Sequence, residues 1–426
     1  MQSIFIQRSV RLLWMAAVVL SAPVGLGVSA SAQKLPGIDA GTGPLGLLLP
    51  KLSSAPAPAW VRPGVRLTYY GASATVAGAG KEWKIDPEGG FQTPDGQHWS
   101  GADKVGGAGQ GITHYDIVGT GADKVAMATS TYLLIPGSAP TLSTTGVALG
   151  RPGAAGDLWV NPEVLKKLAN RSGGGLHIYR APYKIGGEAK PAVWIHTTTD
   201  RGYTLYIYEA ATGLMIHYSS ATSGGPSAVI GSTEGSNTPN TFLVTTTLVA
   251  KRNVAPPWAN DPPPSWVAGI HSLDYRGTMT TFIPGSPALN LPASTRMTVA
   301  ARGPGWVRFK TVFTVGGGRG LPGQTSQTDA ISGAYALGVW INPRALAKLE
   351  PGQQIDHDPA TGVLVAVGRP ASTPRGKAMT VITISNANDK TDLGYDQDNG
   401  MLVYVNQVQR VPPAVNQTRV FLTASQ

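Results

Sequence analysis

Residues 204–218, TLYIYEAATGLMIHY, decide the fold class. Thr and Tyr side chains alternate with Leu205 and Ile207, which is the period of two of a β-strand. The turn residues Ala211-Thr212-Gly213 then lead into a second run, Leu214 to Tyr218, as in a β-hairpin. Further runs rich in β-branched and aromatic residues are Phe242–Val249, Val299–Ala301, Trp306–Val315 and Val381–Ile384. The sequence predicts a mainly β protein of antiparallel sheet.

The same hairpin pattern returns near the end of the chain, as one of four blocks that occur twice in the same order. The pairs are Trp60-Val61, Leu67, Tyr69, Gly71 with Trp266-Val267, Leu273, Tyr275, Gly277; Trp159-Val160-Asn161-Pro162 with Trp340-Ile341-Asn342-Pro343; Tyr208-Glu209-x-x-Thr212-Gly213 with Tyr395-Asp396-x-x-Asn399-Gly400; and Phe242-Leu243 with Phe421-Leu422. Four blocks in one order predict two tandem homologous domains, each a curved antiparallel sheet.

The blocks also set the domain boundaries. We place repeat domain 1 at residues 60–252 and repeat domain 2 at 265–426, joined by a Pro-rich connector, 253–264. The first copy is longer between its first two blocks, and we place the insertion at about 77–111, a Gly-rich stretch. Residues 33–59 are predicted to be a Gly/Pro/Ala-rich linker, in which Leu47-Leu48-Leu49 is a candidate for peripheral membrane contact.

Each Asn-Pro dipeptide predicts one short helix. Asn161 and Asn342 can cap the free amides of the first turn, and the following prolines suit the first helical position. Gly173 and Gly352 are predicted to end these helices. Each domain is therefore expected to be sheet with one short helix.

Residues 1–32 have the layout of a secretory signal peptide. Arg8 and Arg11 precede the apolar stretch Leu12–Leu20, and Ala30-Ser31-Ala32 is a cleavage site before Gln33. The chain contains no cysteine, which excludes disulfides and thiolate metal sites. We expect an exported protein, periplasmic or extracellular, that is stabilised by packing alone.

Composition limits the partners. The net charge is +10, but only 14% of residues are charged and the basic ones are scattered, so a nucleic-acid partner is not expected. The 54 glycines and 34 prolines, with 42% hydrophobic residues, fit a turn-rich β protein with packed cores. No G-x-S-x-G, H-E-x-x-H or P-loop pattern occurs, and no cofactor is expected.

The densest titratable cluster is Asp356-His357-Asp358. Two carboxylates around an imidazole are candidates for acid–base catalysis or cation binding. The alternative, which we favour, is a solvated turn, because Pro359-Ala360-Thr361-Gly362 follows at once. Asp396, Asp398 and Asn399 likewise resemble part of a calcium loop, but they precede Gly400 as in a hairpin turn.

Tryptophan divides into shared and unshared positions. Trp60, Trp159, Trp266 and Trp340 are equivalent in the two copies and are predicted to anchor the cores. Trp83, Trp99, Trp194, Trp258 and Trp306 are not shared, and of these we take Trp83, Trp99, Trp194 and Trp306 as the ligand-binding candidates.

The turns Tyr208–Met215 and Tyr395–Leu402 resemble the Tyr-Asp-x-x-Thr-Gly-Leu-Leu hairpins of periplasmic lipoprotein-carrier-like proteins. The resemblance implies a half-barrel sheet whose concave face holds acyl chains under a helical lid. It assigns no functional residue in this chain.

The leading hypothesis is an exported, non-enzymatic binding protein that carries a lipid-like or other amphipathic ligand on the concave sheet faces. The expected partner is a small amphipathic ligand or an envelope component. One alternative is a structural or surface interaction protein of the cell envelope. Another is a hydrolase of a cell-envelope polymer that uses Asp356, His357 and Asp358. The sequence leaves open the ligand, the oligomeric state and whether the two repeats act alike.

Overall fold

We analysed a computed structural model of the chain. It describes residues 55–77, 84–85, 91–92, 98–99, 109–155, 158–199, 202–223, 240–316, 323–411 and 413–426. The predicted signal peptide, 1–32, and residues 33–54 of the predicted linker lie outside this set.

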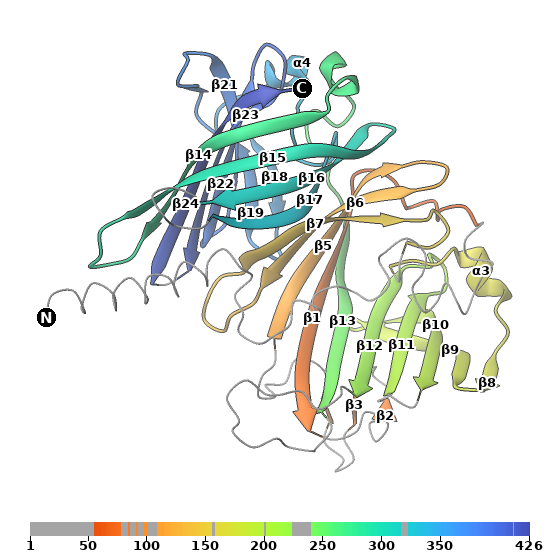
Figure 1. Ribbon diagram of the computed structural model, residues 1–426. Helices are drawn as coiled ribbons and strands as arrows, with labels where there is room; N and C mark the ends of the chain where they lie inside the picture. The colour runs from red at the N-terminus through yellow and green to blue at the C-terminus, as the bar shows by residue number, and fades with distance from the viewer. Residues whose placement is uncertain are drawn as a thin grey trace, which may run out of the picture. The chain divides into compact units, whose positions relative to one another are not determined.

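The first repeat forms a ten-stranded antiparallel sheet, the first sheet (Figure 1). Its strands, in spatial order, are β7 (Thr141–Gly150), β6 (Val125–Leu133), β5 (Gly109–Thr120), β1 (Val65–Ala77), β13 (Asn240–Asn253), β12 (Met215–Ser223), β11 (Gly202–Glu209), β10 (Glu188–Thr199), β9 (Leu176–Ile185) and β8 (Arg171–Gly173).

The second repeat forms an 11-stranded sheet, the second sheet, with the same order of strands. These are β17 (Gln324–Gly333), β16 (Trp306–Val315), β15 (Leu289–Gly303), β14 (Ser272–Phe282), β24 (Ala414–Ser425), β23 (Leu402–Val411), β22 (Asp389–Asp396), β21 (Ala378–Ser385), β19 (Val363–Val367) and β18 (Gln354–Asp358), with β20 (Ala371–Ser372) beside β21. Each strand of the first sheet thus has a counterpart in the second.

This architecture confirms the predicted fold class, mainly β in two tandem antiparallel sheets. Among the described residues the only α-helices are two short ones, α3 (Pro162–Lys167) and α4 (Pro343–Leu346). The hairpin at residues 204–218 is confirmed as β11 and β12, and the other four predicted strands lie in β13, β15, β16 and β21.

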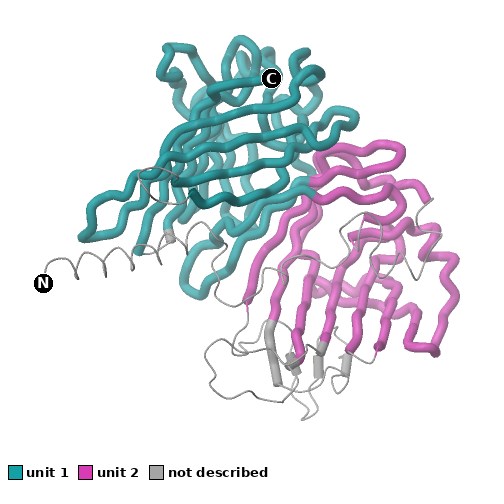
Figure 2. Tube along the Cα trace, viewed as in Figure 1, with its two compact units in different colours: residues 1–26, 128–147, 253–426 teal, residues 27–127, 148–252 magenta. Residues whose placement is uncertain are grey.

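The contacts of the chain divide it into two compact units (Figure 2). One unit contains residues 128–147 and 253–426, and the other contains 148–252 and the described residues up to 127. The outer part of the β6–β7 hairpin is therefore in the same compact unit as the second sheet. The division near residue 252 falls close to the start of the predicted connector.

The two repeats differ most between their first two strands. Residues 78–108 connect β1 to β5, whereas residues 283–288 connect β14 to β15. The longer connection contains a small three-stranded sheet of β2 (Lys84–Ile85), β3 (Phe91–Gln92) and β4 (His98–Trp99).

One face of each sheet packs into a hydrophobic core. Trp159 and Trp340 are buried in the first and second cores, and Trp60 and Trp266 pack against the same cores while partly exposed. In the first core the rings of Trp60 and Trp159 meet edge to face, with centroids 5.7 Å apart. The predicted role of these four tryptophans as core anchors is confirmed.

A turn in each repeat collects hydrogen bonds from distant parts of the chain. We call it the clasp turn: Glu209–Met215 in the first repeat and Asp396–Leu402 in the second. Trp60 Nε1 donates to Thr212 O, and Trp266 Nε1 donates to Asn399 O, both at 2.8 Å. The segment that precedes each sheet is thereby attached to the turn.

A buried tyrosine makes a second attachment. Tyr69 Oη donates to Met215 O, and Tyr275 Oη donates to Leu402 O, both at 2.9 Å. Burial raises the pKa of both phenols well above the usual range, so both hydroxyls remain protonated donors.

The Trp-x-Asn-Pro segment makes the third attachment through its backbone. Val160 N donates to Gly213 O at 2.9 Å, and Ile341 N donates to Gly400 O at 3.0 Å. Gly213 and Gly400 have φ of 72° and 74°. A Cβ at these glycines would lie 1.8 Å from Val160 O and 1.9 Å from Ile341 O, so no larger residue fits without moving backbone.

The asparagines confirm the predicted helix caps and hold the segment upstream of each tryptophan. Asn161 Oδ1 accepts from Glu163 N at 2.8 Å, and Asn342 Oδ1 accepts from Arg344 N at 2.9 Å. Their Nδ2 atoms donate to Pro56 O and Pro262 O, both at 2.8 Å. The repeated unit therefore begins before Trp60 and Trp266, within segments that the sequence suggested were linker and connector.

Two sequence predictions were wrong. Gly173 and Gly352 do not end the helices, because α3 ends at Lys167, where Leu168 already has extended backbone angles, and α4 ends at Leu346. The Phe-Leu block is also not equivalent in the two repeats.

The strand register shows why. Met215 and Leu402 occupy equivalent positions opposite Tyr208 and Tyr395, so His217 corresponds to Tyr404. Thr247 lies opposite His217 and Phe421 lies opposite Tyr404. Phe421 therefore corresponds to Thr247 rather than to Phe242.

The clasp turn makes a direct prediction about stability. Gly400→Ala should lower the free energy of unfolding by about 2–4 kcal/mol, because the new Cβ adds a backbone clash to the unfavourable φ. Gly285→Ala is the matched control, since Gly285 has a φ of 78° and nothing within 4 Å of its Cβ position. It should cost only about 1 kcal/mol. Urea unfolding of the two variants measures both, and equal losses would contradict the clasp.

Candidate functional site

Asp358 uses its carboxylate within its own turn. The chain bends between β18 and β19, where Asp358 Oδ1 accepts from Ala360 N at 3.0 Å, from Thr361 N at 3.1 Å and from Thr361 Oγ1 at 3.1 Å. Asp358 is buried, whereas its strand neighbour His357 is exposed and points to the opposite face. The geometry does not bring Asp356, His357 and Asp358 together around one reacting centre.

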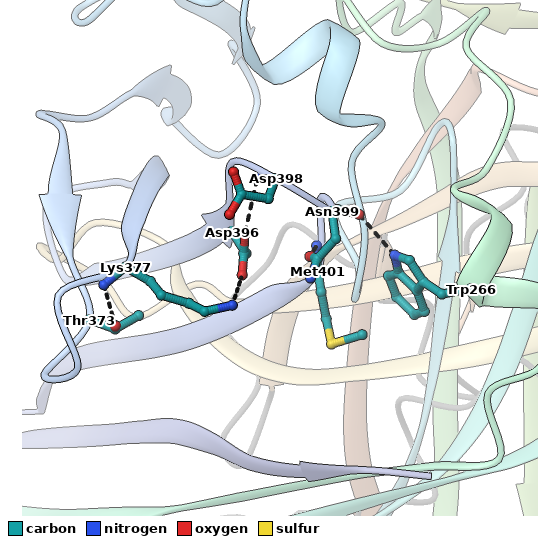
Figure 3. Close-up of polar contacts among 7 residues, drawn as sticks. All are labelled: Trp266, Thr373, Lys377, Asp396, Asp398, Asn399 and Met401. Carbon is teal, nitrogen blue, oxygen red and sulfur yellow. Dashed lines mark hydrogen bonds and ion pairs between the residues drawn. The ribbon is translucent and has the colours of Figure 1, made fainter.

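Asp396, Asp398 and Asn399, which resemble part of a calcium loop in sequence, lie in the second clasp turn and stabilise it (Figure 3). Asp396 Oδ1 accepts from Asp398 N at 2.9 Å, its Oδ2 lies 3.2 Å from Lys377 Nζ, and Asn399 Oδ1 accepts from Met401 N at 2.8 Å. Within the described ranges, no group of three or more His, Cys, Asp or Glu side chains is placed to hold a metal ion. These oxygens therefore support the turn.

The four tryptophan candidates have different environments. Trp83 lies outside the described residues, and so does the side chain of Trp99. Trp306 is buried at the β15–β16 turn. A Cβ on Gly303 would lie 2.3 Å from the Trp306 ring, so this indole packs directly on the backbone of Gly303. Trp194 is buried on β10 in an aromatic cluster, and it is the candidate that leads to a site.

Cross-strand pairs between β9 and β10 build this cluster. Trp194 lies opposite Tyr179, and their rings stack with centroids 5.4 Å apart and planes at 19°. His196 lies opposite His177, and these rings stack at 5.5 Å and 25°. Directly opposed residues point to the same side of a sheet, so all four rings share one face. Trp194 Nε1 donates to Ala181 O at 3.1 Å, which fixes its indole.

Three more rings extend the cluster across the sheet. Tyr203 meets His196 edge to face at 5.6 Å, and Tyr183 contacts both Trp194, at 5.7 Å, and His217, at 5.5 Å. We call these seven residues of β9–β12 the aromatic face: His177, Tyr179, Tyr183, Trp194, His196, Tyr203 and His217. Its Tyr179 ring is 39% exposed, while Trp194 beneath it is 3% exposed.

A hollow of about 440 Å³ lies at the edge of the aromatic face. It is lined by Asn170, Arg171, Ser172, His177, Ile178, Tyr179 and His196. Ser172 Oγ lies 3.0 Å from His177 Nδ1. The rings form an apolar wall, and Asn170, Arg171 and Ser172 bring polar groups to the same hollow.

Arg180 positions the polar part of the hollow. Its guanidinium donates to Leu165 O at 3.0 Å and Leu168 O at 2.7 Å, at the end of α3, and to Asn170 Oδ1 at 3.0 Å. A cation beside the last carbonyls of a helix is electrostatically favourable. The segment that carries Asn170 and Arg171 is therefore fixed to β9.

Burial keeps His196 uncharged. Burial, together with the neighbouring His177, lowers the pKa of His196 to about 4. His196 is therefore neutral at pH 7, and its uncharged ring adds to an apolar surface.

The corresponding face of the second sheet has a different chemistry. By register, Trp194, His196, Leu205 and Ile207 correspond to Val381, Thr383, Asp392 and Gly394. Asp392 accepts from Thr383 Oγ1 at 2.8 Å and from Asn406 Nδ2 at 3.1 Å, and Gln417 Nε2 donates to Asn406 Oδ1 at 2.8 Å. Because the same fold forms with polar residues there, the aromatic face is not required by the fold.

Comparison with known proteins assigns no family to the chain. No protein-family model matches it, and no curated protein does. A structure of a protein of unknown function from the DUF3598 family of Nostoc punctiforme aligns over 85% of this chain and 97% of its own, with 10% identity and a TM-score of 0.16. None of the helices in the described residues is long and apolar enough to cross a membrane.

Sequence reasoning identified Trp194 but missed Tyr179, His177 and His196. The available signal was alternation: residues 177, 179 and 183 of one strand and 194 and 196 of the next are all aromatic or imidazole rings. The pairing that joins them depends on the register of β9 and β10.

The pKa of His196 predicts a pH dependence. The unfolded chain takes up a proton near pH 6.5, but the folded chain does so only near pH 4, so the folded state loses stability as the pH falls through this interval. Urea unfolding at pH 7 and pH 5 should show a smaller loss for His196→Gln than for the unsubstituted chain. An equal loss in both proteins would contradict the burial of a neutral imidazole.

Proposed function

We propose that the chain is a non-enzymatic binding protein that holds a small amphipathic ligand on the aromatic face of the first sheet. One observation carries the proposal: the partly exposed Tyr179 ring stacks on buried Trp194 beside a hollow of about 440 Å³. This volume is in the range of small-molecule sites, and rigid aromatic surface with few polar groups is their usual composition.

The lining supports an amphipathic ligand. Tyr179 and the stacked rings of His177 and His196 form the flat wall, whereas Asn170, Arg171 and Ser172 supply donors and one positive charge. An apolar chain or ring against Tyr179 with an acidic or hydroxylated end near Arg171 uses both parts. Acyl and polyprenyl compounds of the cell envelope have this chemistry.

The location differs from that implied by the resemblance to lipoprotein carriers. The sheet face under α3 is filled by the protein's own core, which includes Trp159, Leu165 and Tyr206. Trp194, Leu205 and Ile207 belong to a separate cluster on the other side of the same strands. We therefore place the ligand on the face away from the helix.

The predicted signal peptide, residues 1–32, supports a protein that acts after export, in the periplasm or outside the cell. The absence of cysteine is compatible with that setting, because the two clasp turns and cores supply the cross-links between segments. The hydrolase alternative is weaker, since the Asp358 carboxylate is engaged by its turn.

A dansyl-labelled undecanoic acid tests the proposal. Its fluorescence should rise on binding to the full mature chain. Tyr179→Ala should raise the dissociation constant about tenfold, which is the loss of affinity expected for one stacked aromatic contact. Phe282→Ala is the matched control, because Phe282 is a similarly exposed aromatic residue, 45% exposed, on the second sheet. No binding, or equal affinity of both variants, would overturn the proposal.

A further inference from the structure

The tip of the β6–β7 hairpin belongs to the same compact unit as the second sheet (Figure 2). Four polar side chains of that unit hold the tip by hydrogen bonds. The tip comprises Ser138, Ala139, Pro140, Thr141 and Leu142. The side chains that contact it are Asn386 and Asn388 of the β21–β22 turn, Asp389 of β22 and Gln409 of β23, and we call them the amide clamp.

Leu142 is bonded through both of its backbone groups. Its N donates to Asp389 Oδ2 at 2.8 Å, and its O accepts from Gln409 Nε2 at 2.9 Å. Asp389 and Gln409 lie opposite each other on β22 and β23, so the pair is set by the sheet register. This is the pattern of groups that an extended peptide offers at one residue.

The preceding residues are bonded mainly through their carbonyls. Asn386 Nδ2 donates to Pro140 O and Asn388 Nδ2 donates to Ala139 O, both at 2.8 Å. Asn388 Nδ2 also lies 3.0 Å from Thr141 Oγ1 and 3.2 Å from Ser138 Oγ. Most of the bonds thus recognise main chain, and the hydroxyls of Ser138 and Thr141 add to them.

The clamp is ordered by its own turn. Asn386 Oδ1 accepts from Asn388 N at 2.9 Å and from Asp389 N at 2.7 Å, and Arg410 N donates to Asn388 O at 2.9 Å. The amide that bonds Pro140 is therefore held by bonds independent of the hairpin. A preorganised site loses little conformational entropy when a peptide binds.

The clamp is specific to the second repeat. By register, Asn386, Asp389 and Gln409 correspond to Thr199, Gly202 and Thr222 of the first repeat. None of these counterparts has a side-chain amide or a carboxylate. These three side chains are therefore not part of what the duplicated fold requires.

We infer that the amide clamp is a peptide-binding site whose partner is the β6–β7 hairpin of a second copy of this chain as well as its own. The roots of the hairpin, residues 125–127 and 148–150, belong to the other compact unit, whereas its tip belongs to the unit that carries the clamp. A hairpin whose roots belong to one unit and whose tip belongs to the other connects the two, and such an element can be exchanged between copies with the same contacts. This inference is independent of the proposed ligand site.

Two complementary variants test the exchange. In the first, residues 135–142 are replaced by Asn-Gly, which leaves the clamp empty. In the second, Asn388→Ala and Gln409→Ala remove the clamp and leave the hairpin intact. Sedimentation velocity should show that each variant alone is a monomer and that their mixture forms a one-to-one heterodimer.

The control carries both changes in one chain and is mixed with the clamp-deficient variant, and it should give no complex. Circular dichroism and thermal unfolding of each chain show that it is folded before mixing. A mixture of the two folded complementary variants that stays monomeric at the highest soluble concentration would overturn the inference, and so would a complex that also forms in the control.

Discussion

In each repeat, the carbonyl oxygens of the clasp turn accept hydrogen bonds from distant segments of the chain. These hydrogen bonds hold the repeat together. Buried carbonyls are costly unless they accept hydrogen bonds, and the clasp turn satisfies its own through a tryptophan, a tyrosine and the Trp-x-Asn-Pro backbone. These three donors belong to segments far apart in sequence. One turn therefore fixes the segment that carries the tryptophan, the strand that carries the tyrosine and the Trp-x-Asn-Pro segment. Glycine at 213 and 400 allows the backbone of the Trp-x-Asn-Pro segment to approach the turn closely.

The clasp also separates what the two repeats share from what they do not. Shared residues cluster at the turn, where even the supporting ion pair recurs, as Lys190 with Glu209 and Lys377 with Asp396. Differences concentrate on the opposite sheet face, which is aromatic in the first repeat and hydrogen-bonded polar in the second. The amide clamp is a further difference. The clasp turn thus stabilises the same fold in both repeats. The sheet face opposite the core, and the turn that carries the amide clamp, have different residues in the two repeats.

The sequence predicts local features well and distant pairings poorly. The hairpin at 204–218 and the Asn caps follow from alternation and capping chemistry, which act within a few residues. The predicted helix ends were wrong, because Leu168 has extended backbone angles and ends α3 without a glycine. The aromatic face depends on strand register, and the clamp joins residue 142 to residues 389 and 409, for which no local signal exists. The Tyr-x-x-x-x-Gly pattern that resembles lipoprotein carriers has a structural role here, because it forms the clasp turn.

The most direct test of the account is native mass spectrometry, followed by organic extraction, of the chain purified from its own host. Because the aromatic face lies on the first sheet alone within the described part of the chain, we predict one acyl or polyprenyl molecule per chain, released on denaturation. A mass without ligand would contradict the proposed carrier function. Two equivalent ligands per chain would contradict the assignment of binding to the first sheet alone.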